Sequence, residues 1–286
     1  MIKLVFFGSF QTYSVQTLQK LLACPDLKIV GVVTTPPRPG DNLVLTKTAV
    51  HQFALDHQLP VFPLENLDII PSDLDKPDFI IVSGFGKLLN DKWLNFPKVM
   101  AINIHHSLLP KYPGRFPAEW AILRSESITG VTAIKMSVKF DQGEIIGQQS
   151  IPIASTDTRE TLYHRLYDLA GDMACRLVTQ EKFSFTSRPP TDFYARQITK
   201  DDGFVPYEYF LNQKSPNIPK IFESIPDKSD ILNKMLRALT PWPGVWTTLP
   251  NGKRMKILSF NTEPVVVQIE GKNPTLWSEI AKYYTK

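Results

Sequence analysis

The segment 99–110 constrains the fold of this chain more than any other stretch of its sequence. An apolar run from Val99 to Ile104 is typical of a buried β-strand, and Asn103 and His105 stand two residues apart at its end. Because side chains alternate along a strand, both polar groups leave the same face. Pro110 then disfavours a helix, so a stiff loop is expected next. Open α/β sheets carry their catalytic residues at the carboxyl ends of strands. Here a hydrogen-bond donor and a titratable base stand side by side at such an end.

A second polar position strengthens the functional interpretation. For Asn103 and His105 alone, two buried polar groups that only satisfy neighbouring loops fit the pattern equally well. The β-branched run 130–136 predicts another strand, and Asp141 follows it in a loop that contains Gly143. A carboxylate carried on a neighbouring strand can orient His105 and stabilise its charged form. Taken alone, an Asp that caps its own turn is the alternative.

Strand-like and helix-like segments alternate through the first two thirds of the chain. Strands are expected at 4–7, 29–34 and 79–83, and helices at 14–22, 47–57, 117–124 and 159–181. Such alternation predicts an α/β fold with a doubly wound, mostly parallel sheet. Gly8-Ser9-Phe10 and Gly84-Phe85-Gly86 lack the spacing of a dinucleotide fingerprint, and the sequence contains no P-loop.

The last third of the chain is organised differently. Six prolines between 187 and 226 predict a connection without a long helix. Beyond it, a helix is expected at 231–239 and strands at 245–249, 256–260 and 265–269, with Asn251-Gly252 as a hairpin turn. We therefore predict a catalytic domain at 1–186, a linker at 187–230 and a small basic β domain at 231–286.

These motifs together resemble those of a known family. The signature of the formyltransferases that use 10-formyltetrahydrofolate is Asn-x-His-x-Ser-Leu-Leu-Pro with an Asp-x-Gly further on. The matching segments here are Asn103-Ile104-His105-His106-Ser107-Leu108-Leu109-Pro110, Thr129-Gly130-Val131-Thr132 and Asp141-Gln142-Gly143. The resemblance begins at the first residue, fades between about 205 and 230, and resumes at 236–244.

The resemblance implies a Rossmann-like formyltransferase fold followed by a shortened, OB-like β-barrel domain. It implies that the Asn103 amide donates to an oxyanion and that His105 stabilises the same charge or moves the proton of the amine. Asp141 then orients the imidazole and favours its charged form. The donor 10-formyltetrahydrofolate, a co-substrate, is expected beside the segment after the catalytic histidine and beside a glycine loop. These donor-site candidates are Ser107, Leu108, Leu109, Pro110, Gly84, Phe85 and Gly86. No metal is expected. His106 points to the opposite face and is expected to be structural.

The C-terminal part bears on the acceptor amine. Segments 236–244 and 268–272 resemble the branch of the family that formylates initiator methionyl-tRNA. Residues 231–286 carry eight Lys or Arg against three Glu, an excess larger than the net charge of +4 of the whole chain. Backbone-directed RNA binding needs such a basic module, although a solvated basic surface without a partner is the alternative. The candidate tRNA contacts are Arg38, Lys253, Arg254 and Lys256.

Other functions stay open from the sequence. An N-formyltransferase that acts on a nucleotide-linked amino sugar would turn over without tRNA. A formyltetrahydrofolate hydrolase would not require the basic module. A catalytically inactive RNA-binding relative on the same fold belongs to a different class, and the intact Asn103, His105 and Asp141 argue against it.

The composition is that of an ordinary globular protein, with 43% hydrophobic and 21% charged residues. No segment approaches a membrane span, and the start of the chain lacks the features of a signal peptide. The only two cysteines, Cys24 and Cys175, are expected as buried thiols in a reducing compartment. We therefore expect a cytoplasmic monomer with no membrane association.

Overall fold

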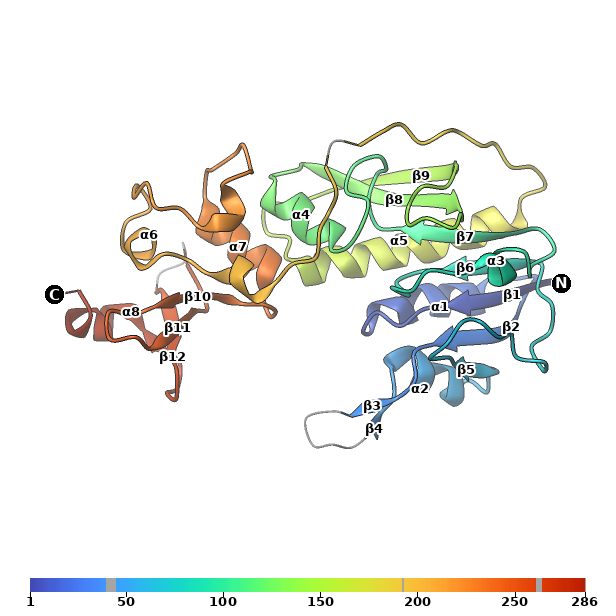
Figure 1. Cartoon of the computed structure of the whole chain (residues 1–286), viewed down its shortest axis with the longest axis horizontal. Coiled ribbons are helices and arrows are strands. Elements are labelled where there is room, and N and C mark those ends of the chain that lie inside the picture. Colours follow the sequence, from blue (N-terminus) through green and yellow to red (C-terminus); the bar gives the residue numbers. More distant parts are fainter. Residues whose placement is uncertain (40–44, 192, 261–263, 286) are drawn as a thin grey trace. The chain divides into compact units, whose positions relative to one another are not determined.

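The computed structural model describes residues 1–39, 45–191, 193–260 and 264–285 (Figure 1). Contacts between residues divide the chain into two compact units, which are described separately. The first unit comprises Met1–Gly114, Thr129–Pro152 and Tyr163–Tyr194, and the second comprises Arg115–Ile128, Ile153–Leu162 and Ala195–Lys286. The three-part division at 186 and 231 stays a prediction. No helix in the described ranges is long and apolar enough to cross a membrane.

A seven-stranded sheet with the order β5-β2-β1-β6-β7-β8-β9 forms the centre of the first unit. Its strands are β1 (Ile2–Phe7), β2 (Leu27–Thr34), β5 (Val61–Pro63), β6 (Phe79–Val82), β7 (Met100–His105), β8 (Ile128–Lys135) and β9 (Ile145–Pro152). The pairs from β5 to β7 are parallel, and β8 runs antiparallel to β7. The sheet is therefore mostly parallel, which confirms the α/β class.

The inner strands are buried because they are almost wholly apolar, as expected when both faces of a parallel sheet are covered. Phe7 of β1 makes edge-on ring contacts with Phe85 and Trp93, with centroids 5.2 and 5.0 Å apart. These rings belong to a cluster that also contains Val33, Ile80 and other apolar residues with little or no exposure. This core fixes the carboxyl ends of β1, β6 and β7, where the chain leaves the sheet through polar residues.

Helices and one small hairpin complete the first unit. They are α1 (Tyr13–Ala23), β3 (Arg38–Pro39), β4 (Leu45–Thr46), α2 (Ala49–Asp56), α3 (Asp91–Leu94) and α5 (Arg159–Thr179), whose first turn belongs to the second unit. Helices α1 and α5 pack against each other: Lys20 lies 3.1 Å from both Asp168 and Asp172. A Cβ at Gly171 would lie 2.5 Å from the Lys20 side chain, so this close helix contact requires glycine.

Cys24 and Cys175 form a disulfide between the end of α1 and the last turns of α5, so the expectation of two thiols is wrong. Their Cα atoms are 6.1 Å apart, an ordinary separation for a bridge. The disulfide could not be predicted from the sequence, because the two residues are 151 positions apart and meet only when the two helices pack.

The second unit combines short helices with a small sheet. The helices are α4 (Pro117–Leu123), α6 (Tyr207–Leu211), α7 (Ile231–Leu239) and α8 (Trp277–Ile280), with 3-10 turns at Lys200–Gly203, Lys220–Phe222 and Ala281–Tyr283. The strands are β10 (Val245–Thr248), β11 (Arg254–Ile257), β12 (Val266–Ile269) and β13 (Thr275–Leu276). They pair in order and antiparallel, which confirms a C-terminal β part.

The hairpin predicted at Asn251-Gly252 joins β10 to β11. Gly252 has a φ of +80°, and the Asn251 side chain accepts a hydrogen bond of 3.1 Å from the Lys253 backbone. Between 187 and 230 the described residues hold only short helices, as the prolines predict. Residues 261–263, where the sequence indicates a shortened barrel, lie outside the described residues.

Candidate active site

Three predicted site residues meet at the carboxyl end of β7. Asn103 and His105 lie on the same face of that strand, where His105 is in register with Thr132 of β8. One oxygen of Asp141 lies 3.4 Å from His105 Nδ1 and 3.4 Å from the Asn103 side-chain nitrogen. We call Asn103, His105 and Asp141 the polar cluster. His105 and Asp141 are less than one-tenth exposed, so water screens their interaction weakly.

The backbone of residues 112–114 holds the polar cluster from a third side. The Gly114 backbone donates a hydrogen bond of 2.8 Å to the second oxygen of Asp141. The Tyr112 carbonyl lies 2.8 Å from His105 Nε2, so each ring nitrogen of His105 faces an oxygen atom. These contacts fix the orientation of the imidazole and of the carboxylate. Residues 112 and 114 could not be recognised from the sequence, because their contribution comes from the backbone.

Left-handed backbone conformations build this arrangement. Asp141 has a φ of +52° and Tyr112 a φ of +55°, a region that residues other than glycine rarely occupy. Gly143 makes a close approach: a Cβ at this position would lie 1.7 Å from the Lys135 backbone oxygen. There is no room for a side chain at this position, so the Asp-x-Gly motif requires its glycine for steric reasons.

The loop after β7 is held by a network of hydrogen bonds centred on Thr132. The Thr132 hydroxyl donates to the Ser107 carbonyl over 2.6 Å and accepts from the Leu109 backbone over 3.0 Å. The Gln148 amide of β9 donates to the Leu109 carbonyl over 2.7 Å and to Thr132 over 2.9 Å. The Ser107 hydroxyl donates to the Lys111 carbonyl over 2.6 Å. The segment 107–110 is thus a rigid turn, held by Thr132 and Gln148, two residues whose role the sequence motifs do not predict.

The glycine loop 84–86 follows β6, beside β7. Gly84 and Gly86 have φ values of +70° and +72°, and a Cβ at Gly84 would lie 2.4 Å from the Tyr167 hydroxyl. The Phe85 ring is 4% exposed and packs in the core, and its carbonyl accepts a hydrogen bond of 3.2 Å from Ser9. Only the backbone of this loop is therefore in a position to meet a ligand.

The predicted RNA contacts fall in both units. Arg38 of β3 is exposed in the first unit, 3.9 Å from Glu65. Lys253, Arg254 and Lys256 are exposed on the β10–β11 hairpin of the second unit. The Arg254 guanidinium lies 4.6 Å from the centre of the Trp246 ring, and Lys256 is the register partner of Trp246. Arg254, Lys256 and Trp246 thus lie close together on the β10–β11 hairpin, and we call these three residues and Lys253 of the connecting turn the basic face.

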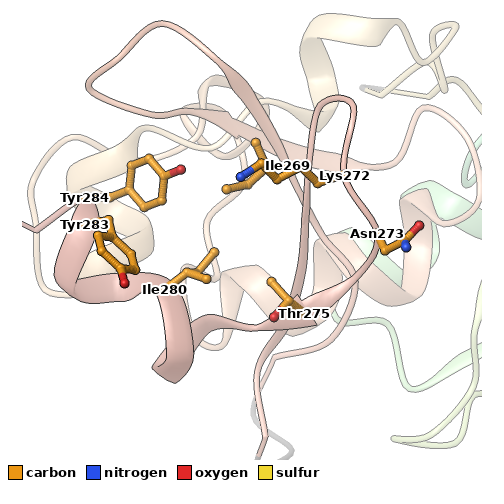
Figure 2. A pocket seen from close by; sticks show the side chains of 7 residues that line it. All are labelled: Ile269, Lys272, Asn273, Thr275, Ile280, Tyr283 and Tyr284. Carbon is orange, nitrogen blue, oxygen red and sulfur yellow. The ribbon is translucent and has the colours of Figure 1, made fainter.

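A cavity of about 120 Å³ lies in the second unit, between β12, β13 and the C-terminal turns (Figure 2). Its lining residues are Ile269, Lys272, Asn273, Thr275, Ile280, Tyr283 and Tyr284. None of them is a predicted site residue, and the only charged one is Lys272. Among the described residues, no group of three or more His, Cys, Asp or Glu side chains is placed to hold a metal ion.

Most of the sequence matches known protein families. Residues 2–178 match the family described as formyl transferase, and residues 227–281 match the one described as formyl transferase, C-terminal domain. The chain belongs to the formyl transferase family.

Particular relatives narrow the comparison. The methionyl-tRNA formyltransferase of Latilactobacillus sakei subsp. sakei (strain 23K) is 36% identical over 90% of this chain and 77% of that protein. The methionyl-tRNA formyltransferase of Enterococcus faecalis (strain ATCC 700802 / V583) is 34% identical over 87% of this chain and 76% of that protein.

Solved structures share the fold. A 4-N formyltransferase from Francisella tularensis superposes with a TM-score of 0.63 at 16% identity, over 88% of this chain and 95% of that one. An N-formyltransferase from Helicobacter canadensis, solved with folinic acid and dTDP-3-aminofucose, has a TM-score of 0.60 at 19% identity, over 94% of this chain and 93% of that one.

Proposed function

We propose that this protein transfers a formyl group from 10-formyltetrahydrofolate to the α-amino group of initiator methionyl-tRNA. The observation that carries the proposal is the polar cluster, in which one carboxylate oxygen of Asp141 lies 3.4 Å from the imidazole of His105 and 3.4 Å from the amide of Asn103. Sequence identity of 33–36% to several methionyl-tRNA formyltransferases supports this acceptor.

The chemistry requires an oxyanion stabiliser and a proton carrier. The amine nitrogen attacks the formyl carbon, forming a C–N bond and a tetrahedral intermediate whose oxygen is negatively charged. The Asn103 amide donates to that oxygen, and His105 stabilises it and moves the proton that the amine loses, after Nε2 of His105 exchanges the Tyr112 carbonyl for the substrate. The bond from the formyl carbon to N10 of the folate then breaks, and N10 takes up a proton. Asp141 holds the imidazole in place throughout.

The donor binds beside the polar cluster in this proposal. The turn 107–110 and the backbone of Gly84–Gly86 border the carboxyl ends of β7 and β6, where open α/β sheets bind their ligands. Because Ser107 already donates to a carbonyl, this turn contributes shape and backbone groups rather than a free hydroxyl. The rigid turn and the donor site are thus the same segment.

The acceptor binds through phosphate contacts in this proposal. Lys253, Arg254 and Lys256 of the basic face, together with Arg38, meet the tRNA backbone, and Trp246 offers a ring on which a base can stack. In this proposal the protein acts in the cytoplasm and is a monomer. Light scattering of the purified protein in solution tests the oligomeric state.

The test is formyl transfer from 10-formyltetrahydrofolate to methionylated initiator tRNA. We expect turnover by the wild type and a loss of about 10²-fold or more in kcat for His105→Ala. Transfer to a nucleotide-linked amino sugar instead of tRNA would contradict the acceptor. Salt-dependent tRNA binding with no turnover of either acceptor would contradict the enzymatic role altogether.

A further inference from the structure

His106 is a buried histidine that the proposed chemistry does not use. It directly follows β7, next to His105, and is 6% exposed. Its ring stacks on the ring of Tyr167 from α5, with centroids 3.7 Å apart and planes inclined by 22°. Its Nε2 lies 3.4 Å from the hydroxyl of Ser83, the residue just after β6. Two elements that border the site therefore meet at this imidazole.

The hydroxyl groups beyond Ser83 fix the direction of these hydrogen bonds. Thr17 of α1 donates its single hydroxyl proton to the Tyr167 carbonyl over 3.0 Å. The Ser83 hydroxyl lies 3.2 Å from Thr17 and must therefore donate to it. Since that donation uses the only Ser83 proton, His106 must donate from Nε2. The order His106 to Ser83 to Thr17 to Tyr167 is thus determined by counting protons.

Tyr167 also packs closely against the glycine loop. Its hydroxyl occupies the space that a Cβ at Gly84 would fill, 2.4 Å from the ideal Cβ position. Directly before this loop, Ser14 of α1 donates to the Ser83 carbonyl over 2.9 Å. The stacked pair of His106 and Tyr167 therefore lies between the end of β7 and the backbone of Gly84.

The imidazole of His106 is held neutral by its surroundings. Burial lowers the pKa of His106 well below its ordinary value of 6.5, and the charge of neighbouring His105 adds to this effect. The residues described against its ring from the other elements, Ser83 and Tyr167, bring hydroxyl groups and no formal charge. A neutral His106 adds no positive charge beside His105.

We propose that His106 is a positioning residue that sets the glycine loop 84–86, and with it the formyl donor, at a fixed place relative to His105. It does so through the directed hydrogen bond to Ser83 and the stack on Tyr167. This inference rests on the proposed donor site at the glycine loop, but not on the identity of the acceptor.

The first test measures donor affinity without any acceptor. Folinic acid (5-formyltetrahydrofolate) serves as the probe in calorimetric titrations of the full chain. His106→Phe keeps a ring on Tyr167 but cannot donate, and Ser83→Ala removes the acceptor of the same hydrogen bond. We expect each to weaken binding by about tenfold, and the double variant to bind no more weakly than either single one. His51→Phe, at a second buried histidine on α2, is the matched control and retains wild-type affinity.

The second test needs no variant and no turnover. Nitrogen-15 NMR of the wild-type histidine rings is expected to show His106 protonated at Nε2 and unprotonated at Nδ1 from about pH 8 down to about pH 6. Protonation at Nδ1, titration near 6.5, or folded variants with affinity within about twofold of the wild type would each overturn the proposal.

The steady-state kinetics separate this proposal from the proposed acceptor. If tRNA is the acceptor, His106→Phe raises the KM for the donor and leaves the KM for tRNA unchanged. A wild type that binds folinic acid but never formylates tRNA refutes the acceptor only, because the titration and the NMR measurement still decide the role of His106.

Discussion

At the scale of single residues, Asp141 makes an electrostatic contact with His105 and a hydrogen bond with the Gly114 backbone, and one substitution can remove the first while keeping the second. Its carboxylate lies 3.4 Å from His105 and accepts a backbone hydrogen bond of 2.8 Å from Gly114. Asp141→Asn keeps an oxygen for Gly114 but loses the charge. We expect kcat to fall by about 10²–10³-fold with little change in melting temperature, as for a lost orienting carboxylate. Steady-state formyl transfer and calorimetric melting check this.

The exposed Asp73 provides the matched control for that substitution. Asp73→Asn should leave both kcat and the melting temperature at wild-type values. An Asp141→Asn variant that keeps full activity while remaining folded would show that the charge of Asp141 is not part of the chemistry.

Asp202 gives a prediction about stability and pH. Burial alone would raise the pKa of Asp202, but hydrogen bonds from Arg196 and Thr199 outweigh burial, so the pKa lies below its ordinary value of 3.8. A lowered folded-state pKa stabilises the protein above pH 3.8, and that stabilisation is lost as the pH falls below it. Asp202→Asn should therefore cost about 1–2 kcal/mol in the free energy of unfolding at pH 7.

Urea unfolding at several pH values measures this difference. The gap between wild type and Asp202→Asn should narrow as the pH drops through the acid range below 3.8. A gap that stays constant with pH would mean that the ion pair of Asp202 with Arg196, at 2.6 and 2.8 Å, does not contribute through its charge.

At the scale of elements, the loop between β8 and β9 depends on one glycine. A Cβ at Gly143 would collide with the Lys135 backbone oxygen at 1.7 Å, and only movement of the loop that carries Asp141 relieves this. Gly143→Ala should therefore lower kcat/KM by about 10²-fold, since a shift of about 1 Å at a catalytic group has that effect. Gly147→Ala is the control in β9, because its Cβ would meet nothing closer than 3.7 Å. Equal activity of the two variants would refute the steric argument.

The disulfide between α1 and α5 should be measurable as stability. Cross-linking residues 151 positions apart restricts the unfolded chain, and the entropy model gives about 5 kcal/mol as an upper figure. We expect a reductant to lower the melting temperature of the wild type. The Cys24→Ser/Cys175→Ser variant should melt at the lower temperature with or without reductant. A wild-type melting temperature that ignores reductant would show that the bridge adds no stability.

The elements that periodicity and turn chemistry determine were predictable from the sequence. Residues 231–239 form α7 as expected, because Leu232, Met235 and Leu239 recur at helical spacing and are buried. Asn103 and His105 share a face because strand alternation is local. The Tyr112 carbonyl could not be predicted as a His105 partner, since it depends on a left-handed conformation at a residue other than glycine. Contacts between helices that are far apart in the sequence, such as the disulfide, could not be predicted from the sequence either.

At the scale of the whole molecule, the basic face should govern the salt dependence of tRNA binding. Each phosphate contact releases counterions, so the slope of log affinity against log salt reflects the number of contacts. Replacing Lys253, Arg254 and Lys256 by Ala should reduce the magnitude of that slope by about 2 and raise the KM for tRNA, with the KM for the donor unchanged. Filter binding at several salt concentrations measures the slope.

Three exposed lysines of the first unit, Lys28, Lys76 and Lys182, provide the control for this charge loss. Their replacement by Ala removes the same charge from the molecule but leaves the basic face intact, so the slope should stay at its wild-type value. Equal effects of the two triple variants would show that tRNA responds to net charge alone.

The short segment 112–114 has a mechanical consequence. It anchors His105 through the Tyr112 carbonyl and Asp141 through the Gly114 amide, so both side chains are fastened to the same three residues. A displacement of this segment would act on the imidazole and the carboxylate together, so we expect the distance between them to change less than either position. Their relative orientation should therefore be less sensitive to movement of the surrounding loops than it would be if each side chain were held by a different segment.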